Sequence, residues 1–283
     1  MPSATLLGQS LISGTFVGGL YGLLGLGLTL SWGMLRQINL AHFALAFLGA
    51  YLTYQLAADG GMDPMLTLVI IAPAFFAVGV TLHWVFARFK VTPFNSLLIT
   101  FGLTVIVESI IQSIWTADFR KLESGYTHVI LKIGKFYLPL PGLLTLGLAI
   151  ALSLGTWAAL RYTDLGRAMR ASAEDAPIAA AFGIDVALLG RLLSGLAAAS
   201  AGVAGVALAL TYTLAPSQIY GWIGVVFAAV MIGGLGNPLG PLAAGLVIGI
   251  SEAMTQAIAA PAWAPLVSFS LLIAVLLVRA RNI

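Results

Sequence analysis

Residues 6–34 of the chain are LLGQSLISGTFVGGLYGLLGLGLTLSWGM, a stretch with no Asp, Glu, Lys or Arg. A helix of this length can cross a bilayer, because about 20 mostly apolar residues span the hydrocarbon core. The first basic residue of the chain is Arg36, so the stretch lacks the positively charged segment that opens a cleavable signal peptide. We therefore expect a retained transmembrane helix, and this expectation sets the fold class.

The composition of the whole chain agrees with a membrane protein. Of its 283 residues, 60% are hydrophobic and 8% are charged, against about 45–50% and about 25% in soluble domains. Thirteen Lys and Arg with ten Asp and Glu cannot cover a globule of this size in water. The apolar excess therefore faces lipid, which excludes an ordinary soluble protein. The net charge of +3 is small, and we expect no nucleic-acid partner.

Motifs for catalysis and nucleotide binding are missing from the sequence. No stretch matches the phosphate loop GxxxxGK[ST], and no cation follows the glycines of residues 233–240, which we interpret as a tight cytoplasmic turn. His42, His83 and His128 are accompanied by no nucleophile elbow or metal-pair motif. The chain also has no cysteine for a disulfide or a thiolate metal site. We therefore expect no catalytic residue, no metal ligand and no enzymatic activity.

Polar and turn-rich breaks divide the chain into nine apolar segments. We interpret all nine as helices of a single polytopic membrane domain over residues 1–283, with eight to ten crossings as the range. The seventh segment is short for a crossing at 1.5 Å per residue, so we expect it to be tilted, broken or re-entrant. The nine segments are residues 6–34, 38–58, 65–88, 95–115, 141–160, 186–214, 221–235, 239–260 and 264–278.

The basic residues of the connecting loops predict the orientation. Nine fall on one side of the membrane and four fall in a single loop on the other, and cytoplasmic loops carry the excess of Lys and Arg. We therefore expect the N-terminus outside and the C-terminus inside. The nine predicted to be cytoplasmic are Arg36, Arg88, Lys90, Arg161, Arg167, Arg170, Arg191, Arg279 and Arg281, and the four predicted to be external are Arg120, Lys121, Lys132 and Lys135.

Two loops are long enough to carry structure of their own. In the external loop, residues 117–140, short apolar runs flank Gly134 and Lys135, which is typical of a hairpin, although a plain connector stays open as an alternative. In the cytoplasmic loop, residues 161–186, Thr163 with Asp164 can cap a helix, and a second helix is expected to start within residues 172–177 and to end near Gly183. The prediction is two short amphipathic helices against the membrane.

Ionisable side chains inside predicted helices are costly, so they mark a cavity or a partner. Glu108 precedes Gln112 by four residues and Glu252 precedes Gln256 by four, which places two polar groups on one face of each helix. Both faces are predicted in the outer half of the membrane. An outward-open vestibule and simple hydrogen bonding between helices both explain them.

Glycines recur on single faces of two predicted helices. Gly14, Gly18 and Gly22 share one face, and Gly245 and Gly249 share another, which predicts close helix packing. Residues 19–52 are also similar to residues 202–235, and the two copies enter the membrane from opposite sides. An inverted-topology repeat explains this similarity, and so does the chance matching of Gly- and Ala-rich sequence.

Three stretches carry a resemblance to a known family: residues 19–42, residues 163–185 and residues 230–241. In order, spacing and total length they resemble the permease family of branched-chain, or hydrophobic, amino-acid ABC importers. The resemblance implies an ABC importer permease fold in the bacterial inner membrane. It also implies uptake of a small solute, a branched-chain or other amino acid or a related amide or carboxylate.

The same resemblance implies the partners and a coupling segment. The partners are two cytoplasmic ATPase subunits that hold ATP and Mg, a second homologous permease in a heterodimer, and an external or periplasmic solute-binding protein, while this chain itself binds no cofactor. Residues 163–185 would dock onto an ATPase subunit, with Met169 and Phe182 as apolar anchors among the charges. The residues assigned to coupling are Thr163, Gly166, Arg167, Arg170, Ala171, Glu174, Asp175, Gly183 and Asp185.

The resemblance also implies a translocation path beside the helix that begins near the motif Asn39, Ala41 and His42. The family commonly has glycine after this histidine, whereas Phe43 stands here, and a bulky aromatic side chain could change which solutes pass. The residues expected along the path are Asn39, His42, Phe43, Glu108, Gln112, Glu252 and Gln256.

Two other functions remain as alternatives. An ion-coupled secondary transporter would use Glu108 or Glu252 as its coupling carboxylate, but it would not need the cytoplasmic helical pair. A sugar or nucleoside ABC permease would share the architecture and differ mainly in residues 38–42.

Overall fold

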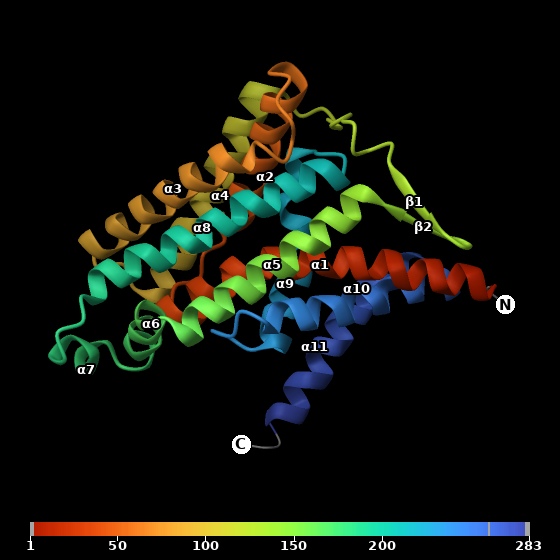
Figure 1. The fold of residues 1–283 in the computed structure, drawn as a ribbon. Helices are drawn as coiled ribbons and strands as arrows, with labels where there is room; N and C mark the ends of the chain where they lie inside the picture. The colour runs from red at the N-terminus through yellow and green to blue at the C-terminus, as the bar shows by residue number, and fades with distance from the viewer. Residues whose placement is uncertain (1–2, 260, 281–283) are drawn as a thin grey trace.

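The computed structural model describes residues 3–259 and 261–280. Every one of the nine predicted segments is helical, and the described residues include one short β-hairpin (Figure 1). Ala260, where the eighth predicted segment ends, and Arg281 lie outside the described residues, as does the side chain of Arg279. The nine helices are α1 (Ala4–Leu35), α2 (Ala41–Tyr54), α3 (Leu68–Arg88), α4 (Pro93–Trp115), α5 (Leu140–Tyr162), α8 (Val186–Thr211), α9 (Ile219–Gly233), α10 (Gly240–Ile258) and α11 (Ala264–Ala280).

Eight of the helical segments in the described part of the chain are long and apolar enough to cross a membrane. The shortest of the nine is α2, with 14 residues, and it continues without a break into a π-helical turn, Gln55–Asp59. The seventh predicted segment is itself short, since α9 has 15 residues, but the 3-10 turn Pro216–Gln218 leads directly into it and gives an apolar helical run over Pro216–Gly233 that is long enough to cross a membrane. The polar residues of that turn hid its helical start.

The centre of the bundle consists of α1 and α8. In the apolar stretch of each helix, 67% of the residues are buried in α1 and 83% in α8, against 17% in α3 and in α4. The outer helices are therefore the ones with lipid-facing surface. Helix α1 is rich in glycine and α8 is rich in glycine and alanine, and these small residues let neighbouring backbones approach closely.

Helices α1 and α10 pack along each other through glycine, as the sequence predicts. A Cβ atom on Gly18 would lie 2.5 Å from the carbonyl oxygen of Gly245, and one on Gly14 would lie 2.7 Å from that of Gly249. The approach is reciprocal, because a Cβ on Gly249 would lie 2.5 Å from the carbonyl oxygen of Gly14. Any side chain larger than hydrogen must therefore push the two helices apart.

The packing of the helices has a two-fold character. Helix α1 packs along α10 and α8 packs along α3, while α2 contacts α4 and α9 contacts α11. If the bundle is divided into α1–α4 and α8–α11, the first helix of each set packs along the third helix of the other set. Helices α1 and α8 also contact each other and run in opposite directions (Figure 1). This arrangement favours the interpretation of an inverted-topology repeat.

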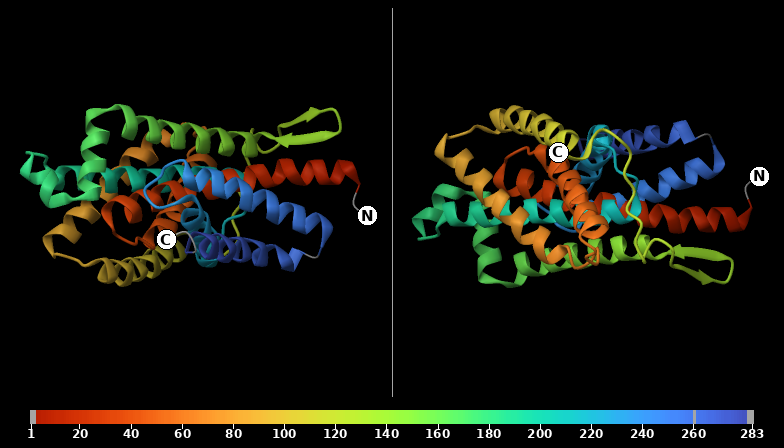
Figure 2. Two further views of the ribbon diagram at one scale, coloured as in Figure 1. Left: turned by 90° about the horizontal axis from the view of Figure 1, so that it is seen from below. Right: turned by 90° about the horizontal axis from the view of Figure 1, so that it is seen from above.

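The loop predicted to be external, residues 117–140, does form a hairpin. Strands β1 (Ile130–Ile133) and β2 (Phe136–Pro139) pair antiparallel, and Gly134 turns the chain with a φ of 62°. Gln9 of α1 fastens the hairpin, because its side-chain amide donates to the carbonyl of Tyr137 at 2.8 Å and accepts from the amide of Tyr137 at 2.9 Å. The hairpin therefore lies beside the start of α1, at one end of the molecule (Figure 2).

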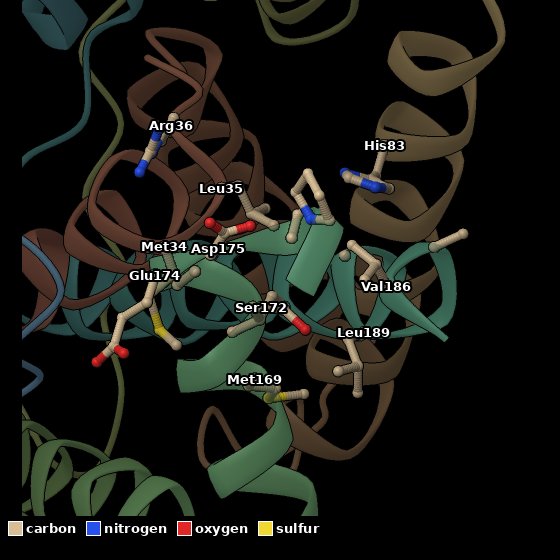
Figure 3. A pocket seen from close by; sticks show the side chains of 16 residues that line it. Met34, Leu35, Arg36, His83, Met169, Ser172, Glu174, Asp175, Val186 and Leu189 are labelled. Atoms are coloured by element: carbon tan, nitrogen blue, oxygen red, sulfur yellow. The ribbon is translucent and has the colours of Figure 1, made fainter. Parts of the chain in front are cut away.

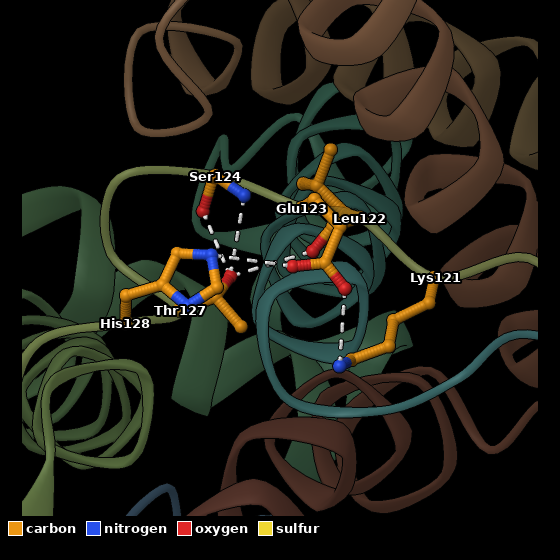
Figure 4. A network of polar contacts seen from close by, with 6 residues as sticks. All are labelled: Lys121, Leu122, Glu123, Ser124, Thr127 and His128. Carbon is orange, nitrogen blue, oxygen red and sulfur yellow. Dashed lines mark hydrogen bonds and ion pairs between the residues drawn. The ribbon is translucent and has the colours of Figure 1, made fainter.

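A polar network holds the chain ahead of the hairpin (Figure 4). The carboxylate of Glu123 lies 3.1 Å from the Lys121 ammonium and 3.5 Å from the His128 ring, while the Ser124 amide donates to the Thr127 hydroxyl. The loop also contacts the segment that precedes α3.

The contact joins Tyr126 to Asp63, which lies in the segment before α3. The Tyr126 hydroxyl donates to the Asp63 carboxylate at 2.6 Å, and this bond, with the backbone amides of Met65 and Leu66, lowers the pKa of Asp63 below its ordinary value. The same bond raises the pKa of Tyr126. This loop is therefore connected to the bundle by a carboxylate that is ionised at neutral pH.

Candidate functional site

Two short helices, α6 (Asp164–Glu174) and α7 (Ala176–Ala181), form the end of the molecule opposite the hairpin (Figure 1). Each helix in this part of the chain has a side-chain cap. Thr163 Oγ1 accepts from the Gly166 amide at 3.0 Å, Asp175 Oδ1 from the Ile178 amide at 3.0 Å, and Asp185 Oδ1 from the Leu188 amide at 2.9 Å. The two predicted helices are confirmed, and Thr163, Asp175 and Asp185 set where α6, α7 and α8 begin.

The α6–α7 unit, residues 164–182, is anchored to the membrane helices. A Cβ atom on Gly166 would lie 2.3 Å from the carbonyl oxygen of Ala159, so glycine permits the sharp corner between α5 and α6. Met169 is 2% exposed and packs with Leu30 of α1 and Leu160 of α5. The expectation that Met169 faces outward as a docking anchor is wrong, because this side chain instead fastens α6 to the bundle.

The outward surface of the α6–α7 unit mixes apolar and charged side chains. Phe182 is 83% exposed and Ile178 is 57% exposed, and their spacing of four residues places them one turn apart along α7. Leu165 of α6 is exposed as well. Ile178 and Leu165 are absent from the sequence-based site, although the four-residue spacing of Ile178 before Phe182 was available as a signal.

Charges surround this apolar surface. Arg167 pairs with Asp164 on the same helix. Arg170 and Glu174 are exposed, and neither takes part in an ion pair with another described residue. Ala171 is also exposed. The unit thus presents two unpaired charges beside an apolar ridge, an arrangement suited to a protein interface.

Gly183 has a different role from a contact surface. Its φ is +83° and a Cβ atom there would meet nothing within 4 Å. The glycine is needed because the chain turns out of α7 in a left-handed conformation that L side chains disfavour. A substitution at Gly183 would therefore strain the backbone and would not report on docking.

The two carboxylates inside the helices have different surroundings. Glu108 is half-buried, with its oxygens 2.6 Å from the Tyr220 hydroxyl and 3.2 Å from the Gln112 amide nitrogen. Gln112 itself is exposed. This polar group lies about 10 Å along α4 from its end at Trp115. A hydrated or protein-covered face fits such a group better than lipid does.

Glu252, in contrast, is 8% exposed and joins three helices. It accepts hydrogen bonds from the Tyr21 hydroxyl of α1, at 2.7 Å, and from the Ser268 hydroxyl of α11. Gln256 is exposed and makes no hydrogen bond to Glu252 in the described residues. For Glu252 the structure therefore favours helix-to-helix bonding. Tyr21, Ser268 and Tyr220 are partners that no sequence spacing indicated.

The residues expected beside a path at the start of α2 are buried in helix packing. His42 is 1% exposed and its Nε2 lies 2.9 Å from the carbonyl oxygen of Leu24. Phe43 is also 1% exposed and stacks on Phe227 of α9 with 6.3 Å between ring centroids. Asn39 is 8% exposed and its Oδ1 has no hydrogen-bond partner among the described residues. In this conformation His42 packs α2 against α1, and Phe43 packs it against α9.

The known proteins whose sequences are similar to this chain are named as transport permeases. The sequence model of the family "branched-chain amino acid transport system / permease component" matches residues 10–276. The high-affinity branched-chain amino acid transport system permease protein LivH of Escherichia coli K12 is 28% identical over 97% of this chain and 94% of its own length.

Two further relatives extend the comparison. The high-affinity permease protein BraD of Pseudomonas aeruginosa is 27% identical over 97% of this chain and 94% of its own length. A probable branched-chain amino acid transport permease protein LivH of Methanocaldococcus jannaschii is 31% identical over 82% of this chain and 76% of its own length. No solved structure matches the chain. Because the family match covers nearly the whole sequence, and because the multi-pass helical fold agrees with it, this chain belongs to the permease family of branched-chain amino acid transport systems.

Proposed function

We propose that this chain is a membrane subunit of an ABC importer that carries branched-chain amino acids, or solutes of similar size and charge, into the cell. The family match and the names of the relatives support the transport class and the solute class. The observation that carries the ABC mechanism is the α6–α7 unit, which presents Ile178 and Phe182 beside free charges while Met169 holds it to the bundle. A secondary transporter has no ATPase partner and would not need such a docking surface.

The remaining subunits follow from the same proposal. Two ATPase subunits would bind the α6–α7 units from the cytoplasm and supply ATP hydrolysis, so ATP and Mg would be bound by those subunits. A second homologous permease would complete the membrane part as a heterodimer, and a solute-binding protein would deliver substrate to the outer face.

The proposal is tested by transport in vesicles. Proteoliposomes that contain the purified importer should take up radiolabelled leucine only when the solute-binding protein is outside and ATP is inside. An imposed proton or sodium gradient without ATP should drive no uptake. Uptake driven by the ion gradient alone would contradict the proposal and would favour the secondary transporter.

We also propose that Glu108 lines the outer part of the solute path. Of the two carboxylates inside the helices, Glu108 is the partly exposed one, and its neighbours Gln112 and Tyr220 are polar. Glu108→Gln removes the charge but keeps the group that accepts from Tyr220. Uptake should fall about fivefold, since a charge-assisted hydrogen bond is about 1 kcal/mol stronger than a neutral one, while expression and melting temperature stay unchanged.

A matched variant is Glu252→Gln, at the buried position. It should lower the melting temperature of the detergent-purified protein, because one of the two hydroxyl groups that donate to Glu252 then faces an amide donor. Wild-type uptake by Glu108→Gln at normal expression would return Glu108 to a packing role.

The orientation proposed is N-terminus outside and C-terminus inside, in the inner membrane of a bacterium. The ends of α3 and α5 and the start of α8 lie at the same end of the molecule as the α6–α7 unit (Figure 1) and carry Arg88, Arg161 and Arg191, which agrees with a cytoplasmic location. The opposite end carries the hairpin with Lys132 and Lys135.

Single cysteines test the orientation, because the chain has none of its own. Ser172 is a poor position, since its hydroxyl is buried. Lys135→Cys and Ala181→Cys are both at exposed positions. A membrane-impermeant maleimide added to intact cells should label Lys135→Cys and spare Ala181→Cys, and opened cells should label both. Labelling of Ala181→Cys in intact cells would reverse the proposed topology.

A further inference from the structure

A cavity of about 690 Å³ opens between the α6–α7 unit and the nearby ends of α1, α3 and α8 (Figure 3). This volume is within the range of roughly 300–1,000 Å³ that is usual for sites of small molecules. None of the residues assigned above to solute passage lines it. The cavity therefore needs an explanation of its own.

Part of the cavity wall is aliphatic. Met34 and Leu35 come from α1, Leu189 and Leu193 come from α8, and Met169 comes from α6. A solute with an aliphatic side chain would lose its contact with water against this wall, which is favourable.

Other groups on the wall are polar and lack partners. The Ser172 hydroxyl and Nδ1 of His83 are buried without a hydrogen-bond partner among the described residues. Such atoms are costly to bury unless a ligand or water bonds to them. Two polar groups from different helices in the same cavity can therefore form hydrogen bonds to a ligand.

The wall also has charges of both signs. Arg36, which directly follows α1, and two carboxylates at the α6–α7 junction, Glu174 and Asp175, line the cavity, and the ion pairs of the described residues all lie elsewhere. Asp175 uses Oδ1 to cap α7, which leaves Oδ2 free. In the view of Figure 3, Arg36 is at the left and His83 at the right, with Leu35 and Asp175 drawn between them. The guanidinium suits a carboxylate, and the carboxylate suits an ammonium.

We propose that this cavity binds an aliphatic α-amino acid from the cytoplasm. The solute's carboxylate would face Arg36 with Ser172 or His83, its ammonium group would face Asp175, and its side chain would lie on the aliphatic wall. The inference rests on the proposed function for one point, that the imported solute is itself such an amino acid. The site is then a product site.

Binding there would restrain the coupling segment. The solute would contact α1 and α8, which are fixed in the bundle, and also α6 and the α6–α7 junction. A ligand that binds best when these elements are held together stabilises that arrangement and opposes any movement that separates them. The imported amino acid would therefore slow its own uptake from the inside.

The first experiment measures uptake of external radiolabelled leucine into proteoliposomes of the complete importer, with or without unlabelled leucine trapped inside. Trapped glutamate at equal concentration is the solute control. For each protein the ratio of the two rates is compared, so changes in basal rate cancel. Trapped leucine should slow the wild type. The concentration that halves the rate should rise at least tenfold in Arg36→Gln and about threefold in Ser172→Ala.

Lys90→Gln is the matched control. Lys90 is an exposed cation just after the end of α3 that is near the cavity, but it does not line the cavity. It should follow the wild type. A second measurement needs no transport: in the purified importer, leucine should slow the maleimide labelling of Ala187→Cys, since Ala187 is exposed and lines the cavity, and Arg36→Gln should abolish this protection.

The outcomes separate the two proposals. If the wild type takes up leucine but trapped leucine has no effect and gives no protection, the cavity site is refuted while the importer stands. Equal inhibition of the wild type and Arg36→Gln refutes the site as well. If no vesicle takes up leucine, the proposed function fails, and the labelling result alone decides the cavity. If the ATPase subunits protect Ala187→Cys and leucine adds nothing, the cavity belongs to the docking surface and the inference is overturned.

Discussion

Phe182→Glu should reduce ATP-driven uptake by about thirtyfold or more while the protein still inserts and folds. The side chain is 83% exposed, so the change costs the isolated chain little. An apolar anchor at the centre of an interface is worth about 2 kcal/mol or more, which is a factor of about 30. Association with the ATPase subunits and the stimulation of their ATPase activity should fall together.

Phe89→Glu is the matched control for this prediction. Phe89 is 73% exposed at the end of α3, outside the α6–α7 unit, and the replacement carries the same charge. It should copurify with the ATPase subunits as the wild type does. Arg170→Glu, which reverses an exposed charge on α6, should weaken association as Phe182→Glu does. Unchanged coupling in Phe182→Glu, or equal losses in both phenylalanine variants, would contradict the docking role.

Gly18→Leu should prevent the stable packing of the bundle. A Cβ atom at this position already lies 2.5 Å from a carbonyl oxygen of α10, and backbone cannot move aside as a side chain can. Overpacking of this kind costs about 3 kcal/mol, the upper part of the usual range. The melting temperature in detergent should drop sharply, and little monodisperse protein should be recovered by size-exclusion chromatography.

Gly147→Leu provides the comparison within a membrane helix. Gly147 of α5 is exposed, and a Cβ atom there meets nothing within 4 Å. This variant should be recovered as the wild type is. Normal recovery of Gly18→Leu would show that α1 and α10 do not approach as closely as the structure has them.

Features that depend on neighbours in sequence could be predicted from the sequence. The cap at Thr163, the turn at Gly134 and the glycine faces of α1 and α10 each follow from residue type and spacing, and each is present. The helical segments followed from hydropathy for the same reason. Local rules were enough because the backbone of a membrane helix must satisfy its own hydrogen bonds.

Features that depend on distant partners could not be predicted in this way. Met169 has the same spacing whether it faces the bundle or a partner, and only the position of α5 and α8 decides that it faces inward. Glu108 and Glu252 have the same pattern in sequence, yet Tyr21 and Ser268 enclose one of them while the other stays partly exposed. The tertiary arrangement separates a packing carboxylate from a candidate path residue.

Cross-linking from α7 tests the central claim, that the α6–α7 unit docks onto an ATPase subunit. Ile178→Cys places a thiol on the exposed ridge beside Phe182, and Lys135→Cys places one on the hairpin at the other end. In membranes that contain the complete importer, a short bifunctional reagent should join Ile178→Cys to an ATPase subunit, with a yield that changes when ATP is added, and should join nothing cytoplasmic to Lys135→Cys. An assembled importer in which Ile178→Cys gives no ATPase cross-link would contradict the account.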